Sequence, residues 1–269
     1  MLNWFKKKKD PEFNFSAVKT DMHSHILPGI DDGAKNINDA ILLAKRFEEL
    51  GYQKLVATPH VMADYFRNTP DTINKALDIL REGLAQNNIN ITVEAAAEYY
   101  LDETFEKKVE KKEVLTFGAQ QYLLFELSYI NAPHNLYDII SKIQFAGYQP
   151  VLAHPERYPY YYGDTDNYQQ IKDAGCLLQL NTISLTGYYG KGCKQTAEEL
   201  VDNYMIDFMG SDMHHLRHAD ALKAALELDR VQNILSQPQL NNLLLYQNNS
   251  KLKLFSILTR ISMPQQDPV

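Results

Sequence analysis

The stretch from Thr20 to Gly33 reads TDMHSHILPGIDDG and places two histidines and three carboxylates close together. If its first part is a β-strand, His23 and His25 point to the same side, because alternate residues of a strand share a face. Two imidazoles can then reach one metal ion, and the Pro-Gly turn that follows can bring Asp31 or Asp32 back beside them. An H-x-H pair also occurs as an ordinary surface or core pair, so the rest of the chain has to decide between these interpretations.

The length and composition are those of a folded globular protein. A chain of 269 residues has the size that α/β barrels commonly reach as single domains. Hydrophobic residues make up 45% and charged residues 23%, which is normal for a protein with a large core. The net charge of −7 argues against a nucleic-acid partner, since binding to phosphates requires a basic surface.

The two cysteines, Cys176 and Cys193, are too few for a disulfide framework and lack C-x-x-C spacing, which fits a reducing compartment. Neither is followed by the arginine of the C-x5-R loop of cysteine-dependent phosphatases, because Thr182 and Glu199 occupy those positions. We therefore expect both cysteines to be buried structural residues.

A single domain is expected from residue 16 to residue 263, because no linker rich in Pro, Gly or Ser divides the chain. Residues 1–15 are expected to form a flexible basic and aromatic tail, and residues 264–269 a frayed end. The aromatic and lysine residues from Trp4 to Lys9 could make weak contact with an anionic membrane surface, although a solvated tail is the favoured alternative. We expect a cytoplasmic protein, at most peripheral at the inner membrane face, since no secretory signal or transmembrane segment is recognisable.

Short apolar runs alternate seven times with helical segments, which is the pattern of βα units in an α/β fold. The predicted strands cover residues 17–22, 54–58, 90–97, 122–125, 150–153, 176–180 and 206–210. The predicted helices cover about residues 37–50, 70 onward, 102–113 (a solvated helix), 134–146, 196–204 and 219 onward, with a short helix before the sixth strand.

Histidines and carboxylates close six of these seven strands. In a βα barrel the carboxyl ends of all strands face one mouth, so residues far apart in sequence meet there. Core packing would predict Val, Leu or Ala at such places. A mixture of imidazole and carboxylate ligands without thiolates suits Mn2+, Fe2+ or Zn2+. The number of ligands implies two or three clustered ions, which enzymes use to hydrolyse phosphoesters. The strand-end residues are His23, His25, His60, Glu98, Glu126, His154, Asp212 and His214.

These residues fall within ordered motifs that resemble the PHP (polymerase and histidinol phosphatase) superfamily. The similarity is strongest to its bacterial protein-tyrosine phosphatases of capsule and exopolysaccharide operons, and it runs from about Thr20 to Leu222. Each motif alone is common, whereas the ordered set is specific. The motifs are Asp21-x-His23-x-His25, Asp31-Asp32-Gly33, Thr58-Pro59-His60, Glu98-Tyr99, Phe125-Glu126, His154-Pro155-Glu156-Arg157-Tyr158 and Ser211-Asp212-Met213-His214.

The resemblance implies a distorted (βα)7 TIM-like barrel with two to three divalent ions, manganese above all, with iron or zinc as alternatives. Glu98 would bridge the first and second ions, and Asp32 is chosen instead of Asp31 because it aligns with the family's aspartate before glycine. The implied ligands are His23, His25, Glu98 and Asp212 for the first ion, Glu98, Glu126 and His154 for the second, and Asp32, His60 and His214 for the third.

Two arginines are candidates for a catalytic role, because a phosphate group needs cationic donors. Arg157, in a loop expected at the barrel mouth, can offer a bidentate fork to phosphoryl oxygens, with a surface salt bridge as the alternative. Arg217 lies slightly closer to the last ligand histidine than the resemblance leads one to expect. Nearby, His215 and His218 are either acids at the rim or ordinary surface histidines.

Many of the seventeen tyrosines fall in loops that follow strands. Their aromatic faces could line a slot for a phosphotyrosine ring. Packing over the barrel rim is the favoured alternative for all of them except Tyr158.

The resemblance implies a metal-dependent protein-tyrosine phosphatase that acts on the tyrosine-rich tail of a membrane tyrosine kinase controlling capsular or exopolysaccharide synthesis or export. Within the same fold, the alternative is a histidinol-phosphate phosphatase or another small-molecule phosphomonoesterase. A non-catalytic, metal-stabilised scaffold belongs to a different class and predicts an eroded ligand set, whereas every expected ligand position is filled here. None of these alternatives fixes an oligomeric state.

Overall fold

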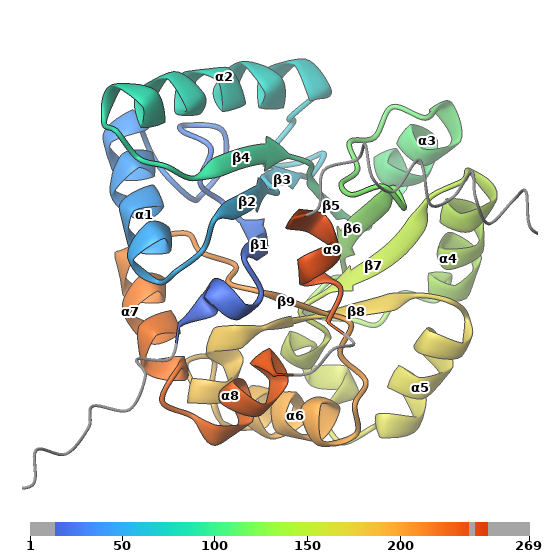
Figure 1. Cartoon of the computed structure of the whole chain (residues 1–269). Helices are drawn as coiled ribbons and strands as arrows, with labels where there is room; N and C mark the ends of the chain where they lie inside the picture. Colours follow the sequence, from blue (N-terminus) through green and yellow to red (C-terminus); the bar gives the residue numbers. More distant parts are fainter. Residues whose placement is uncertain (1–13, 237–239, 247–269) are drawn as a thin grey trace, which may run out of the picture.

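A computed structural model describes residues 14–236 and 240–246 of the chain (Figure 1). The expected N-terminal tail, with its segment from Trp4 to Lys9, lies outside these residues except for its last two positions. The expected frayed end, residues 264–269, lies outside them entirely. The limits of the single domain, residues 16 and 263, therefore stay a prediction.

The described residues form an α/β barrel in which all paired strands run parallel. One sheet has the order β1-β2-β4 and the other β3-β5-β6-β7-β8-β9. Since β3 continues β2 and β5 continues β4, the strands occupy seven positions, and the predicted distorted (βα)7 TIM-like barrel is confirmed. The strands are β1 (Thr20–Ser24), β2 (Lys54–Ala57), β3 (His60–Val61), β4 (Thr92–Ala95), β5 (Glu98–Tyr100), β6 (Tyr122–Glu126), β7 (Gln149–Ala153), β8 (Leu177–Asn181) and β9 (Phe208–Gly210).

The barrel closes where the end of β9 meets β1. Asp212 N donates a hydrogen bond to His23 O at 2.8 Å, and His25 N donates to Met213 O at 3.0 Å. Below them, Ser211 N donates to the buried carboxylate of Asp21 at 2.8 Å. These bonds lie at the carboxyl ends of both strands, so closure itself sets the H-x-H pair beside Asp212.

Helices surround the barrel wall and connect successive strands (Figure 1). Thr69 caps α2 with Pro70 in its first turn, and the helix buries one apolar face that includes Ile73, Leu77 and Leu80. None of the helices in residues 14–236 and 240–246 is both long and apolar enough to cross a bilayer. The helices are α1 (Ile37–Glu49), α2 (Pro70–Gln86), α3 (Glu103–Lys111), α4 (Leu136–Phe145), α5 (Thr165–Asp173), α6 (Lys191–Asp202), α7 (Leu216–Ala225), α8 (Asp229–Leu235) and α9 (Asn242–Tyr246), with 3-10 turns η1 (Phe15–Ala17), η2 (Pro155–Arg157), η3 (Pro159–Tyr161) and η4 (Thr182–Thr186).

The first strand differs from its predicted limits of residues 17–22. The 3-10 turn η1 occupies the start of that range, and β1 begins only at Thr20. The apolar residues that suggested an earlier strand, including Val18, are buried from a turn conformation. The segment predicted as a solvated helix also differs, because α3 buries Phe105 and Val109 on one face.

The amino-terminal end of the barrel is covered by α9, which lies over the barrel in Figure 1. Leu245 of this helix joins the apolar cluster inside the barrel. The buried amide of Asn242 reaches both strands of the seam: Nδ2 donates to Thr20 O at 2.9 Å and to Met209 O at 2.8 Å. Its Oδ1 accepts from Met209 N at 3.0 Å, so one side chain satisfies three backbone groups of β1 and β9.

Replacement of Asn242 by alanine is expected to lower the free energy of unfolding by on the order of 3 kcal/mol, because buried backbone groups lose their partner. Urea denaturation measures this loss. Asn241→Ala, at the preceding and less buried position, is the control and should change stability by about 0.5 kcal/mol or less. Equal losses in the two variants would show that the amide of Asn242 does not hold the seam.

Candidate metal centre

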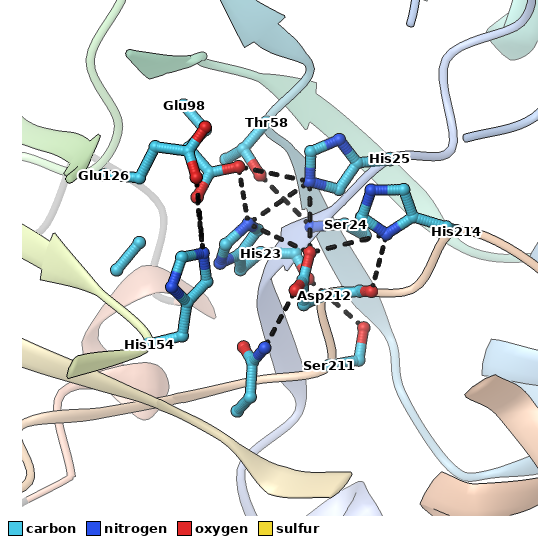
Figure 2. A network of polar contacts seen from close by, with 12 residues as sticks. His23, Ser24, His25, Thr58, Glu98, Glu126, His154, Ser211, Asp212 and His214 are labelled. Atoms are coloured by element: carbon cyan, nitrogen blue, oxygen red, sulfur yellow. Dashed lines mark hydrogen bonds and ion pairs between the residues drawn. The ribbon is translucent and has the colours of Figure 1, made fainter. Parts of the chain in front are cut away.

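The predicted ligands meet at the carboxyl-terminal end of the barrel, and the side chains drawn in Figure 2 point toward one another. Strand ends, the loop after β1, and the short breaks between β2 and β3 and between β4 and β5 place them at the end of the barrel where parallel strands bring distant residues together. They lie in β1 (His23) and just after it (His25), in the following loop (Asp32), at the start of β3 (His60) and β5 (Glu98), at the end of β6 (Glu126), and after β7 (His154) and β9 (Asp212 and His214).

Four residues form the group predicted for the first ion. Ligand atoms of His23, His25, Glu98 and Asp212 all lie within 4.8 Å of one another. Nε2 of His23 is 3.2 Å from Oε2 of Glu98 and 3.3 Å from Nε2 of His25. Nε2 of His25 is 3.2 Å from Oδ1 of Asp212. Two imidazole nitrogens and two carboxylate oxygens thus face one common point.

A second group contains His25, Asp32, His60 and His214, whose ligand atoms also lie within 4.8 Å of one another. It includes the three residues predicted for the third ion, with His25 common to both groups. Asp31 lies behind His25 instead, with Oδ2 2.8 Å from Nδ1. A carboxylate there accepts the ring proton and leaves Nε2 facing the group, so the geometry favours Asp32 over Asp31 as a ligand.

A third group differs from the prediction for the second ion in one member. It joins Glu98 and Glu126 to His60, whereas the prediction joins them to His154. His154 is adjacent nonetheless, because its Nε2 is 2.9 Å from Oε1 of Glu98 and 3.9 Å from Oε2 of Glu126. Glu98 belongs to two of the three groups. A carboxylate that bridges two ions is expected to lie between two such groups.

The charges of the cluster fit divalent cations. Burial disfavours protonation of His23, yet Glu98 and Asp212 outweigh burial and raise the pKa of His23 to about 9. Burial would raise the pKa of both carboxylates, but the neighbouring imidazoles hold each pKa well below its usual range. Protonated imidazoles neutralise the negative charge of the buried carboxylates. Bound divalent cations would neutralise the same negative charge. Oε2 of Glu98 and Nδ1 of His60 are buried 3.1 Å apart, yet neither makes a well-aligned hydrogen bond to any described residue.

Two predicted ligands have a left-handed backbone, with φ of 33° at His154 and 50° at Asp212. Residues with a Cβ adopt this conformation at a cost on the order of 1 kcal/mol each. Such strain persists where the surrounding structure imposes it, and it concentrates at functional sites. Here it turns the chain sharply at the ends of β7 and β9.

Two amide side chains of β8 hold predicted ligands in place, and neither amide was among the residues predicted for the site. Oε1 of Gln179 is 2.8 Å from Nδ1 of His23, and Nε2 of Gln179 donates to Oδ1 of Asn181 at 3.0 Å. Nδ2 of Asn181 then donates to Oδ2 of Asp212 at 2.8 Å. Gly210 leaves room for this chain, because a Cβ there would lie 2.7 Å from the Gln179 amide. The signal in the sequence is an alternation of polar residues in a buried strand, LLQLN.

Arg157 lies against the centre instead of in a surface salt bridge. Its Nη1 donates to Oδ2 of Asp212 at 2.8 Å, and its side chain is 23% exposed. The neighbouring Glu156 is fully buried and accepts hydrogen bonds from Asn181 N and Ser184 Oγ. Glu156 therefore fastens η2, which ends in Arg157, to the end of β8 and to η4.

Arg217 lies farther out than Arg157. Its side chain is exposed and lines, together with Asp32 and His214, a pocket of about 430 Å³ at the rim. His218 is neither a surface histidine nor a rim acid, because it is buried and burial lowers its pKa to about 4. Its Nδ1 lies 3.2 Å from the backbone nitrogen of His214 and supports that turn.

Tyr158 does not face a substrate slot, which corrects the prediction made for it. The side chain is fully buried. Its hydroxyl donates to Ala153 O at 3.1 Å and accepts from Leu127 N at 2.9 Å. Tyr158 is therefore a core residue that ties the ends of β6 and β7 together.

Both cysteines are buried, as expected. Burial raises the pKa of the Cys193 thiol to about 12 and raises that of Cys176 as well. Neither side chain supplies a thiolate nucleophile near neutral pH.

An α/β barrel that gathers histidines and carboxylates at the carboxyl ends of its strands is the architecture of a metal-dependent hydrolase. The model of the family described as capsular polysaccharide synthesis, CpsB/CapC, matches residues 19–252. The chain belongs to this family, which confirms the resemblance to the tyrosine phosphatases of capsule operons.

Relatives of the chain carry the name tyrosine-protein phosphatase. YwqE of Bacillus subtilis is 30% identical over 197 residues, which cover 73% of this chain and 78% of YwqE. CpsB of Streptococcus pneumoniae is 29% identical over 202 residues, which cover 73% of this chain and 83% of CpsB.

The solved structures agree with this family. One solved structure comes from a study of YwqE of Bacillus subtilis and CpsB of Streptococcus pneumoniae, described as metal-dependent tyrosine phosphatases. It matches with a TM-score of 0.74 and 26% identity, and the match covers 93% of this chain and 97% of the chain in that structure. The histidinol phosphate phosphatase of Lactococcus lactis, solved with zinc, L-histidinol and phosphate, has a TM-score of 0.51 and 12% identity, and covers 82% of this chain and 95% of its own. The second likeness shows a common fold alone.

Replacement of Gln179 by leucine is expected to weaken binding of Mn2+ by about 10- to 100-fold, because His23 loses the acceptor that orients its ring. Calorimetric titration of the metal-free protein measures this change. Gln86→Ala removes an exposed amide whose one hydrogen bond within the described part of the chain goes to Glu82, and it serves as the control. Unchanged affinity in Gln179→Leu would show that this hydrogen bond does not position the ligand.

Proposed function

We propose that this protein is a metal-dependent phosphatase that hydrolyses phosphotyrosine in a protein substrate. The observation that carries the proposal is the convergence of imidazole and carboxylate ligands beside Arg157 at one end of the barrel. Divalent ions bound there would supply an activated water and would stabilise charge on the phosphoryl oxygens. The names of the relatives support the choice of phosphotyrosine.

The proposed ligands keep the predicted set, and the geometry supports it without fixing the partition among ions. Two to three ions are proposed, with manganese taken from the family resemblance and iron or zinc as alternatives that suit the same donors. The set is His23, His25, Asp32, His60, Glu98, Glu126, His154, Asp212 and His214.

Arg157 is proposed to bind the phosphoryl group. Asp212 holds one nitrogen of its guanidinium, and the fork geometry leaves further N–H groups for phosphate oxygens. Arg217, exposed at the rim pocket, is proposed as a second and more distant cation. A tyrosine phenolate is a good leaving group, so this arrangement does not require a strong general acid, and the neutral, buried His218 agrees with that.

The proposed substrate is the tyrosine-rich tail of a membrane tyrosine kinase that regulates capsular or exopolysaccharide synthesis. Its support is the family's description, capsular polysaccharide synthesis, together with the names of the relatives. A cytoplasmic position belongs to this proposal, with at most a weak contact between the segment Trp4 to Lys9 and the inner membrane face. Histidinol phosphate remains the alternative substrate, and only the common fold supports it.

Removal of metal with a chelator is expected to abolish hydrolysis of a phosphotyrosyl peptide, and added Mn2+ is expected to restore it, because the ligands alone cannot activate water. Phosphate release measures the rate. Cys193→Ser should retain activity, since its buried thiol takes no part. Faster turnover of histidinol phosphate than of the peptide would contradict the substrate assignment. Protein that binds metal and hydrolyses neither compound would support the non-catalytic scaffold.

Arg157→Ala is expected to lower kcat/KM for the phosphotyrosyl peptide by about 100- to 1000-fold, because a partly buried charged donor to the phosphoryl group is lost. Arg217→Ala, at the exposed rim, should lower it by only about tenfold. Metal analysis of both proteins separates this effect from loss of ions through Asp212. A loss in Arg217→Ala as large as that in Arg157→Ala would place Arg217 on the phosphate itself.

A further inference from the structure

Two tyrosine rings enclose the guanidinium of Arg157. Its Cζ lies 5.0 Å from the ring centroid of Tyr129 and 4.2 Å from that of Tyr189. The first tyrosine follows β6 and the second follows η4, so the rings come from different loops. Tyr129 also stacks on the ring of His154, with centroids 5.9 Å apart and planes inclined by 22°. One ring therefore lies over both the phosphate-binding candidate and a predicted metal ligand.

Packing and hydrogen bonds account for the positions of Tyr158 and Tyr168 but not for that of Tyr129. Tyr158 and Tyr168 are buried, and each donates its hydroxyl proton to a backbone oxygen, of Ala153 and Pro155 respectively. Tyr129 is 38% exposed, and its hydroxyl makes no hydrogen bond to any residue within 14–236 or 240–246. Its ring thus stands at the mouth of the barrel without a structural bond of its own.

A phosphotyrosine held by Arg157 has to bring its own ring to this surface. The ring is joined to phosphorus through a single oxygen, so it lies beside whatever flanks the guanidinium. Tyr189 is the more enclosed of the two neighbours, with a buried hydroxyl, whereas Tyr129 is open to solvent. Aromatic rings attract one another in offset or edge-to-face arrangements with centroids about 4.5–7 Å apart.

We propose that Tyr129 is the wall of an aryl-binding slot and that it makes the centre prefer aryl over alkyl phosphates. This inference rests on the proposed function and adds to it a specificity residue outside the ligand set. Arg157 keeps its position through Asp212, so loss of the Tyr129 ring leaves phosphate binding intact and removes only the contact with the aromatic leaving group.

The test compares kcat/KM of Tyr129→Ala and the unchanged protein, both loaded with Mn2+, on phenyl phosphate and ethyl phosphate. The variant should lose about tenfold on phenyl phosphate, the effect of one well-formed aromatic contact, and less than about twofold on ethyl phosphate. Tyr129→Phe keeps the ring and should match the unchanged protein on both. Tyr137→Ala removes a tyrosine on α4 that is 42% exposed, and it is the matched control.

A second measurement does not depend on turnover. Calorimetric titration of the Mn2+ protein with phenylphosphonate and methylphosphonate should show Tyr129→Ala binding the first about tenfold more weakly and the second unchanged. Equal losses for the aryl and alkyl compounds would overturn the inference, because the ring would then serve to position Arg157. No loss for either would overturn it as well. If the protein without substitutions does not hydrolyse a phosphotyrosyl peptide, the proposed function is overturned instead. That result is known before any variant is compared.

Discussion

The carboxylate of Asp212 is divided between two environments, and the centre depends on this division. Oδ1 faces the imidazoles of His23 and His25, while Oδ2 accepts hydrogen bonds from Arg157 and Asn181. Because Oδ2 is held on two sides, the carboxylate has little freedom to rotate, and Oδ1 stays directed at the ligand group. One residue therefore links the metal-binding donors to the cation proposed for the phosphate.

Burying so many polar groups lowers the stability of the fold unless each group has a hydrogen-bond or opposite-charge partner. The protein meets this requirement for most of these groups with the amides of β8 behind the predicted ligands and with opposite charges inside the cluster. Gln179 and Asn181 from β8 fix His23 and Asp212, and Asp31 fixes His25. Tyrosine hydroxyls and the Asn242 amide do the same for backbone groups elsewhere in the barrel. The predicted ligands His23, His25 and Asp212 are thus oriented by hydrogen bonds from the protein itself.

The convergence of the predicted ligands could be foreseen because parallel strands deliver their carboxyl ends to one place and the ordered motifs identify the family. The supporting residues could not. An amide such as Gln179 in a buried strand becomes informative only once the register of β8 against its neighbours places it behind His23. Tyr129 lies in a loop whose path no periodicity describes. The first strand was placed too early because the apolar Val18 packs from a turn, and Tyr158 looked accessible because sequence does not show that backbone groups surround its hydroxyl.

Asn242 joins the seam from the far end of the chain. It is 222 positions from Thr20, and Ser211 is 190 positions from the Asp21 carboxylate that it contacts across the same seam. Contacts this distant carry a large loop-closure entropy and form slowly. During synthesis, β1 therefore leaves the ribosome long before its partner β9 and the helix that covers both. We expect the nascent chain to carry its histidines on unclosed strands for most of translation, so that the predicted ligands meet only after β9 and α9 have left the ribosome.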